Sequence, residues 1–168
     1  MSEQPETKSG FFAMFTLREA VAGDYPRVIE LLDHAHLFTQ DIHAIGGKRW
    51  VLADGAEVVQ GFIGLEVRGG LALLRSTVVA AEARSAGFGA RLTAHALNWA
   101  RQNAITRVYC FSTDAGGYWQ RFGFVPAPVD ELVAALPDAS QVKHFERMGW
   151  LPTELAWRLD LSHPSERD

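Results

Sequence analysis

The amino-acid sequence predicts one α/β domain in which a mostly antiparallel sheet is flanked by helices. The chain has 168 residues, of which 48% are hydrophobic, and this is enough for a substantial core in a single domain. Three segments with the composition of strands follow one another closely, at residues 49–53, 57–67 and 71–79. Because the turn pairs Asp54-Gly55 and Gly69-Gly70 separate them, we expect an antiparallel meander.

The segment before this meander predicts one strand and two helices. Residues 15–20 alternate between the two sides of a strand. Asp24 can cap a helix whose first turn tolerates Pro26, and apolar residues then recur at helical spacing as far as Ala35. Residues 36–47 contain a Gly-Gly pair and predict a second, shorter helix followed by a loop.

The segment after the meander predicts two helices and three strands. Residues 90–103 carry an apolar stripe at helical spacing, and residues 115–122 predict a shorter helix that Gly123 closes. The expected strands are residues 107–112, a strand that opens at Phe124, and residues 155–161. The segment 126–152 carries several prolines and is expected to be a long loop, a feature that often accompanies function.

Charge and composition limit the classes of partner. The formal net charge is −4, so the chain has no sequence-independent attraction to nucleic acid or to acidic membranes. No apolar run reaches the roughly 18 residues of a membrane span, and residues 1–10 lack the basic start of an export signal. Cys110, the single cysteine, excludes an internal disulfide and suits the cytoplasm. We therefore expect a cytoplasmic domain at 11–161 with a small-molecule ligand, between disordered tails at 1–10 and 162–168.

The motif Arg84-x-x-Gly87-x-Gly89-Ala90 lies between the expected strand 71–79 and the helix that follows it. Backbone N–H groups at a helix N-terminus are unpaired, and glycines let a phosphate approach them without a Cβ clash. Two glycines also occur as plain turn residues, so a turn without a ligand is the alternative. A dinucleotide-binding unit would need G-x-G-x-x-G and an acidic residue about 20 positions later, and a Walker loop would need Gly-Lys-Ser/Thr. The sequence has neither pattern here.

The order of strand, Arg-x-x-Gly-x-Gly, helix, strand and short helix ending in Gly123-Phe124 resembles the central half of a GNAT acetyltransferase, and the resemblance covers roughly residues 17–161. Two runs are similar to the amino-acid N-acetyltransferases of this superfamily, particularly the arsenic-operon-associated branch. These runs are Leu73-Leu74-Arg75-Ser76 before the motif and Tyr118-Trp119-Gln120-Arg121-Phe122-Gly123-Phe124 after it.

The resemblance implies a mixed, mostly antiparallel sheet of six to seven strands that is splayed at an acetyl-CoA site. It also implies direct transfer of acetyl to the primary amine of a small molecule, such as an amino acid or a toxic amino-acid analogue. The residues expected to hold acetyl-CoA are Val78, Val79, Arg84, Ser85, Ala86, Gly87, Phe88, Gly89, Ala90 and Ser112. The alternatives are N-terminal or lysine acetylation of a protein and a non-catalytic acyl-CoA sensor. A homodimer remains open.

The catalytic residues depart from the family's pattern. The superfamily's tyrosine, which protonates the leaving thiolate, is replaced by Trp119, and the neighbouring Tyr118 points about 100° away on a helix. Tyr118 is therefore either the general acid or a structural aromatic. The usual acidic base is replaced by Leu73, which leaves Glu66 on the preceding strand as the candidate base. Asp114 is better explained as a helix cap, and a water chain could replace a dedicated base.

Arg75 and Thr77 are the candidate substrate-binding residues. Alternation along residues 71–79 places both on the side of Val79, beside the expected thioester. Arg75 would hold a carboxylate or a similar anion of the acceptor. An internal ion pair with Glu66 across the adjacent strand is the alternative. No metal site is expected, since the two-residue spacing of the histidines near position 35 is poor for ligands on a helix.

Overall fold

A computed structural model describes residues 14–44, 46–84 and 86–161, and the predicted tails lie outside these residues. In this part of the chain the strands form one seven-stranded sheet in the order β1-β2-β3-β4-β5-β7-β6. The strands are β1 (Thr16–Glu19), β2 (Gly47–Ala53), β3 (Val59–Arg68), β4 (Leu71–Val79), β5 (Arg107–Phe111), β6 (Val125–Ala127) and β7 (Ala156–Asp160). All neighbouring strands are antiparallel except β4 and β5, which run parallel. The predicted mixed, mostly antiparallel sheet is confirmed.

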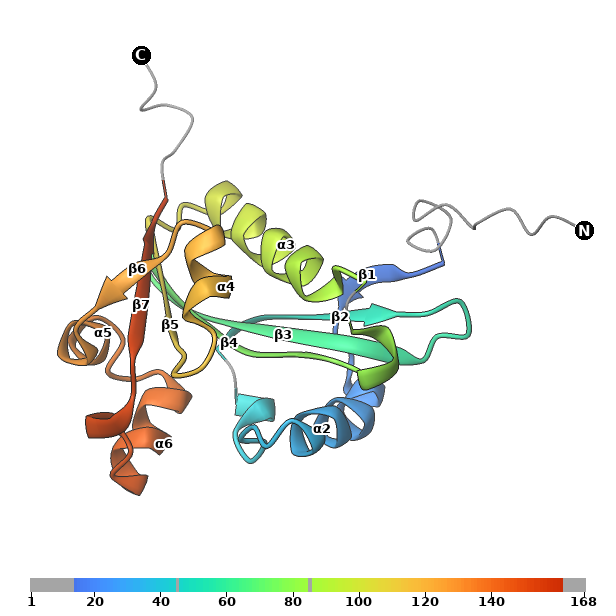
Figure 1. Ribbon diagram of the computed structural model, residues 1–168, viewed down its shortest axis with the longest axis horizontal. Coiled ribbons are helices and arrows are strands. Elements are labelled where there is room, and N and C mark those ends of the chain that lie inside the picture. Colours follow the sequence, from blue (N-terminus) through green and yellow to red (C-terminus); the bar gives the residue numbers. More distant parts are fainter. Residues whose placement is uncertain (1–13, 45, 85, 162–168) are drawn as a thin grey trace, which may run out of the picture.

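Helices cover both faces of the sheet (Figure 1). The α-helices are α2 (Tyr25–His34), α3 (Phe88–Gln102), α4 (Gly116–Arg121), α5 (Val129–Ala135) and α6 (Ser140–Met148). Helices α2 and α3 lie on opposite faces of β3 and β4, while α5 and α6 lie beside β5 and β7 (Figure 1). The described residues also form four short 3-10 turns: η1 (Ala22–Asp24), η2 (Ile42–Ala44), η3 (Ala81–Ala83) and η4 (Leu151–Thr153). None of the helices in the described part of the chain is long and apolar enough to cross a membrane.

The N-terminal predictions hold for the strands and need two corrections for the helices. Pro26 lies in the first turn of α2, as predicted, but the carboxylate of Asp24 does not cap this helix. It accepts the Val21 N–H at 2.8 Å and pairs with Arg18 at 2.8 Å, so it stabilises the turn before α2. The second helix, predicted within 36–47, is only the single 3-10 turn η2. This segment lacks a stripe of apolar residues long enough to hold an α-helix against the sheet.

The prediction of a long loop at 126–152 is wrong, because this segment contains β6, α5 and α6. Its prolines lie at the boundaries of these elements, where a missing N–H is tolerated, and Pro126 lies in the edge strand β6. Gly149 ends α6 with a left-handed φ of 71°. Both helices have apolar faces that form a second core with strands β4, β5 and β7, made of Leu73, Tyr109, Leu132, Leu136, Ala139, Val142 and Ala156.

Candidate functional site

Strands β4 and β5 pair over only part of their length. The parallel ladder joins Leu71–Leu73 to Arg107–Tyr109, although β4 continues to Val79 and β5 to Phe111. Beyond Leu73 the two strands separate, so one edge of β4 has no partner strand among the described residues. Backbone N–H and C=O groups inside a protein need partners, and an extended ligand with amide groups can supply them. The unpaired edge of β4 therefore offers backbone groups to such a ligand, and we call this edge the slot.

A β-bulge in β4 lies at this splay. The register with β3 shifts between Phe62 and Gly64, and Ser76 has a φ of 58°, which is rare for a residue with a side chain. A bulge adds one residue to one strand and turns the local backbone groups out of the ladder. The bulge contains Ser76 and Thr77. The splayed edge of β4 therefore carries a strained backbone at Ser76, a feature often found at functional sites.

The bulge also changes which residues share a face. Arg75 lies opposite Gly64 of β3. Val78 lies opposite Phe62, which is two residues before Gly64 in the same strand. Residues two apart on a strand point to the same side, so Arg75 shares a face with Val78. The predicted common face of Arg75 and Val79 is therefore wrong, because one inserted residue reverses the alternation.

The motif between β4 and α3 forms a helix N-terminus open to a ligand. Gly87 precedes α3 with a left-handed φ of 80°, and the helix begins at Phe88, two residues earlier than predicted. A Cβ placed on Gly89 would lie 3.6 Å from the hydroxyl of Tyr118 and 3.9 Å from Cγ2 of Val79. The first turn of α3, the end of β4 and Tyr118 thus surround one space, and the unpaired N–H groups of the turn suit an anion there.

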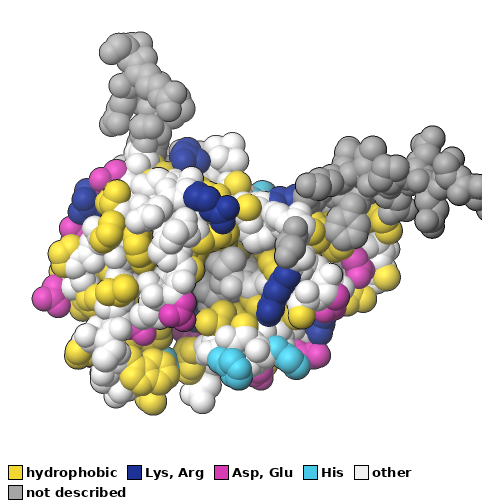
Figure 2. Space-filling view, in the orientation of Figure 1, with side chains coloured by type: hydrophobic (Ala, Val, Ile, Leu, Met, Phe, Trp, Pro, Cys, Tyr) yellow, Lys and Arg dark blue, Asp and Glu magenta, His cyan; other side chains and the backbone are white. Residues whose placement is uncertain are grey.

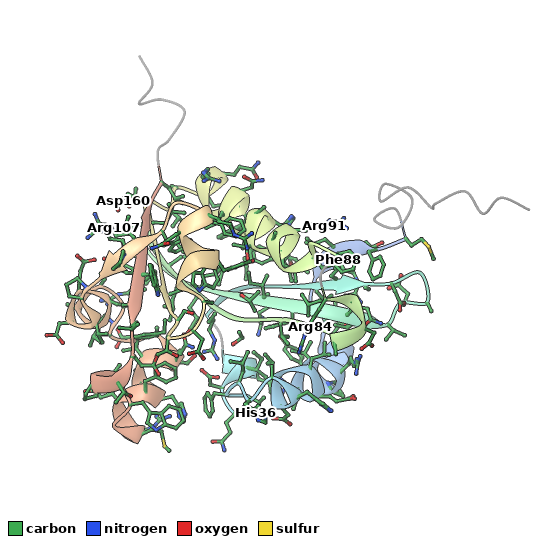
Figure 3. All side chains as sticks on the ribbon, in the orientation of Figure 1. His36, Arg84, Phe88, Arg91, Arg107 and Asp160 are labelled. Carbon is green, nitrogen blue, oxygen red and sulfur yellow. The ribbon has the colours of Figure 1, made fainter. Side chains whose placement is uncertain are left out.

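Basic side chains lie around the start of α3. Figure 3 shows Arg84 and Arg91 beside Phe88, and Nε of Arg84 donates to the Val79 carbonyl at 3.3 Å. Nη1 of Arg91 is buried and has no hydrogen-bond partner among the described residues. An unpaired guanidinium nitrogen of this kind is expected where the partner is a bound anion. Arg121 lies 5.5 Å from the centre of the Tyr118 ring. In the space-filling view, Lys and Arg side chains lie over the α3 side of this face, and His side chains lie over α2 (Figure 2).

Sequence reasoning missed Arg91 and Arg121. The signal for Arg91 was its place in the first turn after the glycines, where a cation would meet the same anion as the N–H groups. Ser85, a predicted ligand-binding residue, lies outside the described residues. Ala86 and Ala90 lie on either side of Gly87 and Gly89 at the open end of α3, as the motif predicts.

Tyr118 and Trp119 have different surroundings. The Tyr118 hydroxyl is 2.9 Å from Oγ1 of Thr93 on α3, and burial raises the pKa of this phenol despite the hydrogen bond with Thr93 and the charge of Arg121. Trp119 is 7% exposed and packs against Phe124 in the larger core. The phenol therefore lies beside Gly89, at the start of α3.

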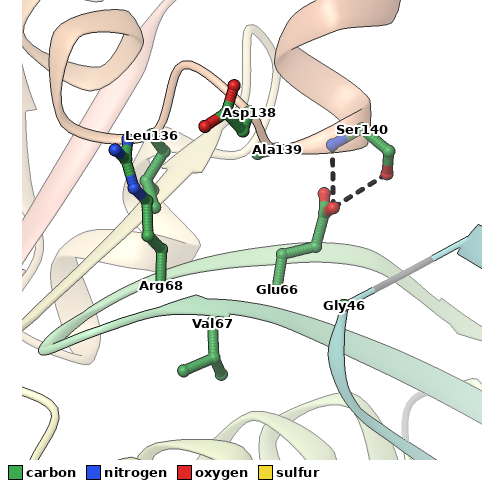
Figure 4. Close-up of a pocket in the computed structure, with 8 residues that line it drawn as sticks. All are labelled: Gly46, Glu66, Val67, Arg68, Leu136, Asp138, Ala139 and Ser140. Atoms are coloured by element: carbon green, nitrogen blue, oxygen red, sulfur yellow. Dashed lines mark hydrogen bonds between the residues drawn. The ribbon is translucent and has the colours of Figure 1, made fainter.

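Glu66 and Arg75 are held in one buried network. The Glu66 carboxylate accepts the backbone N–H and the hydroxyl of Ser140, both at 2.8 Å, at the start of α6 (Figure 4). Nη1 of Arg75 donates to Glu66 at 3.2 Å and also to Asp41, while Nη2 donates to Asp41 at 2.6 Å. The ion pair that the sequence left open as the alternative is thus present, with Asp41 as an additional partner.

This network favours structural roles for Glu66 and Arg75. The side chain of Arg75 is 1% exposed, and its guanidinium also donates to Ser76 and Ser140. Burial alone would raise the pKa of Asp41, but the hydrogen bonds and charge of Arg75, helped by Ser140, hold that pKa below its usual value. Glu66 also borders a cavity of about 250 Å³ together with Arg68, Leu136 and Asp138 (Figure 4). The assignments of Glu66 as a base and of Arg75 as a substrate ligand stay predictions.

A larger pocket of about 660 Å³ lies at the splay. Ser76 of the bulge and Ser112 after β5 both line it, and its other walls come from residues 35–38, α6 and the segment before β7. His36, one of these residues, lies on the α2 side of the sheet, away from Phe88 and Arg91 (Figure 3). The pocket borders β4 at Arg75 and Ser76, and the start of α3 lies near Val79 at the end of the same strand.

The residues at the end of β5 correct one further expectation. Asp114 does not cap α4, because the hydroxyl of Ser112 accepts the Ala115 N–H at 3.2 Å instead. Asp114 lines the larger pocket, as does Glu154 from the segment before β7. Burial, reinforced by the charge of Asp114, raises the pKa of Glu154. Two carboxyl groups thus line the same pocket.

Comparison with known proteins identifies the fold. Residues 46–126 match the family model described as the acetyltransferase (GNAT) domain. A comparison with curated protein sequences finds no match. The structure is similar to that of N-acetylglutamate synthase from Neisseria gonorrhoeae, solved with coenzyme A and N-acetyl-glutamate, with a TM-score of 0.72 and 23% identity. That similarity covers 89% of this chain and 35% of the synthase, so the chain spans about a third of the synthase's length.

Two shorter proteins are similar over nearly their whole length. The ribosomal-protein-S18-alanine N-acetyltransferase from Escherichia coli has a TM-score of 0.67 and 15% identity, covering 92% of this chain and 99% of that protein. A GNAT-family acetyltransferase from Staphylococcus aureus has a TM-score of 0.67 and 15% identity, covering 88% and 99%. Residues 46–126 therefore match the model of the GNAT acetyltransferase domain, and the chain has the fold of these enzymes.

Proposed function

We propose that the protein is an acetyl-CoA-dependent N-acetyltransferase that acts on the primary amine of a small molecule. The observation that carries this proposal is the splay of β4 from β5, with the open N-terminus of α3 near Val79 and a pocket beside Ser76. The GNAT domain at 46–126 and the solved synthase with coenzyme A support it.

The described residues fit coenzyme A along the slot. The pyrophosphate belongs on the N–H groups of Gly87–Ala90, next to Arg84 and to the unpartnered nitrogen of Arg91. The amide groups of the pantetheine arm would pair with the free edge of β4 at Val78 and Val79. When bound, acetyl-CoA supplies an activated acyl group, which the slot directs toward the bulge.

The amine would attack the thioester carbonyl directly, so that the amide forms as the C–S bond breaks and CoA leaves as its thiolate, which takes up a proton. Cys110 lies in the core with 1% exposure, and burial raises the pKa of its thiol, so it is not available to carry the acyl group. An ammonium must lose a proton before it attacks, and the carboxyl groups of Asp114 and Glu154 line the pocket where this occurs. Thr77, in the bulge, contributes to the acceptor end of the slot.

A small acceptor is favoured over a protein chain because α6 and the segment around Trp150 wall the pocket on one side. The S18-alanine enzyme keeps protein acetylation as the second candidate. The similarity to the arsenic-operon-associated branch of amino-acid acetyltransferases stays a prediction from the sequence, as do the cytoplasmic location and a homodimer.

The test is transfer of acetyl from acetyl-CoA to a panel of small primary amines and of peptides, followed by release of CoA thiol and by mass spectrometry of the products. We expect acetylated small amines, with thiol release in equal amount. Products from peptides alone would contradict the small-molecule assignment. CoA binding without transfer to any acceptor would indicate the sensor instead.

We expect Tyr118→Phe to lower kcat by no more than about tenfold, because general acid catalysis contributes roughly 10²- to 10⁴-fold only where the acid reaches the leaving group. The Tyr118 hydroxyl lies beside Gly89 at the start of α3, where the pyrophosphate is proposed to bind, and it is hydrogen-bonded with Thr93. The loss should therefore appear mainly in the KM for acetyl-CoA. Tyr25→Phe, a buried tyrosine on α2, is the matched control. A loss of kcat above about a thousandfold would instead identify Tyr118 as the acid.

A further inference from the structure

The acceptor pocket has aromatic walls. Phe38 enters from the connection after α2, Phe111 from the end of β5, and Phe145 and Trp150 from α6 and the segment after it. Phe38 stacks on the buried ring of His144 with 3.4 Å between ring centres. Trp150 makes a T-shaped contact with the same His144 ring at 5.2 Å, so His144 packs between two of the aromatic residues of the pocket. Flat apolar walls of this kind suit an aromatic or alkyl body, and aromatic faces also attract cations.

The pocket has no spare guanidinium for a substrate anion among the described residues. Arg75 and His36 are its basic lining residues there. Arg75 already pairs with both oxygens of Asp41 and with Glu66, so this group of three carries one net negative charge. A carboxylate that approached Arg75 would also approach two carboxylates, and like charges in a poorly hydrated site repel strongly.

The remaining charges in the pocket are negative. Asp114 and Glu154 both line the pocket, and burial together with the charge of Asp114 raises the pKa of Glu154, so a cation in the pocket would relieve this repulsion. Gln141 also lines the pocket, and its side-chain oxygen is buried with no hydrogen-bond partner in the described part of the chain. That oxygen accepts hydrogen bonds, so it too fits an N–H group and not a carboxylate.

We propose that the acceptor is an amine that carries no carboxylate, namely a primary ammonium on an aromatic or alkyl body or a diamine, and not a free amino acid. The inference rests on the proposed acetyltransferase function and narrows its substrate class. It assigns Asp114 and Glu154 to recognition of the acceptor's positive charge, and Arg75 to the fold of the pocket.

The experiment measures CoA-thiol release with matched pairs of acceptors that differ only in the carboxylate: tryptamine with tryptophan, and cadaverine with lysine. The amide of tryptophan, which keeps the size without the charge, is the third probe. We expect kcat/KM for each amine to exceed that for its amino acid by at least about tenfold, because the carboxylate meets only like charge in the pocket. The amide should behave as the amine does.

Charge-neutral variants test whether Asp114 and Glu154 cause the preference for the amine over the amino acid. In Asp114→Asn with Glu154→Gln, the preference for the amine should shrink by about threefold or more, since partly exposed charges act through screened interactions. Glu57→Gln, which removes a charge from the exposed turn between β2 and β3, should leave the preference unchanged.

The outcomes separate this inference from the function on which it rests. Thiol release that is equal for both members of each pair, or faster with the amino acids, would overturn the inference and leave the acetyltransferase function intact. An unchanged preference in the double variant would overturn the roles of Asp114 and Glu154. Absence of thiol release with every amine, amino acid and amide, in protein that binds CoA, would contradict the proposed function itself.

Discussion

Gly89→Trp is expected to weaken CoA binding by at least about a hundredfold, equivalent to roughly 2.7 kcal/mol, while the circular dichroism spectrum stays near that of the wild type. The Cβ position of Gly89 lies among the Tyr118 hydroxyl, Val79 and the open end of α3. An indole there would occupy the space of the pyrophosphate and cover the N–H groups that hold it. Isothermal titration calorimetry with CoA measures the loss.

Two variants make this result specific. Gly89→Ala should keep most of the affinity, because its Cβ would make only ordinary contacts at 3.6 and 3.9 Å. Gly23→Trp places the same indole where a Cβ has no neighbour within 4 Å, far from α3 in the sequence, and should bind CoA normally. A folded Gly89→Trp protein with wild-type affinity would show that CoA binds elsewhere.

Asp41→Asn should lower the free energy of unfolding by about 3 kcal/mol, because it removes a charged partner from a buried guanidinium. The side chains of Arg75 and Asp41 are 1% and 11% exposed, and Asp41 receives hydrogen bonds from both terminal nitrogens of Arg75. Glu66 remains as a second partner, which places the expected loss at the lower end for such pairs. Urea unfolding at neutral pH measures it.

The same variant has a defined pH dependence. The pKa of Asp41 is lowered in the folded protein, so its contribution is complete above the unfolded pKa and is lost as the pH falls through the folded value. The difference between wild type and Asp41→Asn should thus be constant near neutrality and shrink below about pH 4. Glu30→Gln, which removes an exposed pair with Arg27, should cost about 0.5 kcal/mol or less. Equal stability of the wild type and Asp41→Asn would show that the pair of Arg75 with Asp41 does not stabilise the folded protein.

The sequence predicted the elements whose signals are local. The meander from β2 to β4 follows from two turn pairs. A helix after Gly87 and Gly89 was also predicted, although α3 begins two residues earlier than expected. Helices α5 and α6 were missed because prolines at their boundaries resemble those of a loop. Their apolar residues pack in one core with Leu73 and Tyr109, which come from other parts of the chain, so the sequence alone does not show what these residues contact.

The site was predictable where it depends on one motif and not where it depends on long-range contacts. The bulge at Ser76 reverses the alternation of β4, and no residue type in the sequence marks it. Arg75 meets Asp41 across 34 positions and Ser140 across 65, so its partners could not be identified from spacing. Asp114 was expected to cap a helix, and only the packing of the segment before β7 places it in a pocket with Glu154.

The central claim is that the splay of β4 from β5 is the CoA site, and a crystal structure of the protein with bound CoA tests it most directly. We expect the pyrophosphate within hydrogen-bonding distance of the N–H groups at Gly87–Ala90, with Arg91 Nη1 as a partner, and the pantetheine arm along β4 beyond Leu73. CoA bound at any other surface, with water along the free edge of β4, would contradict the account.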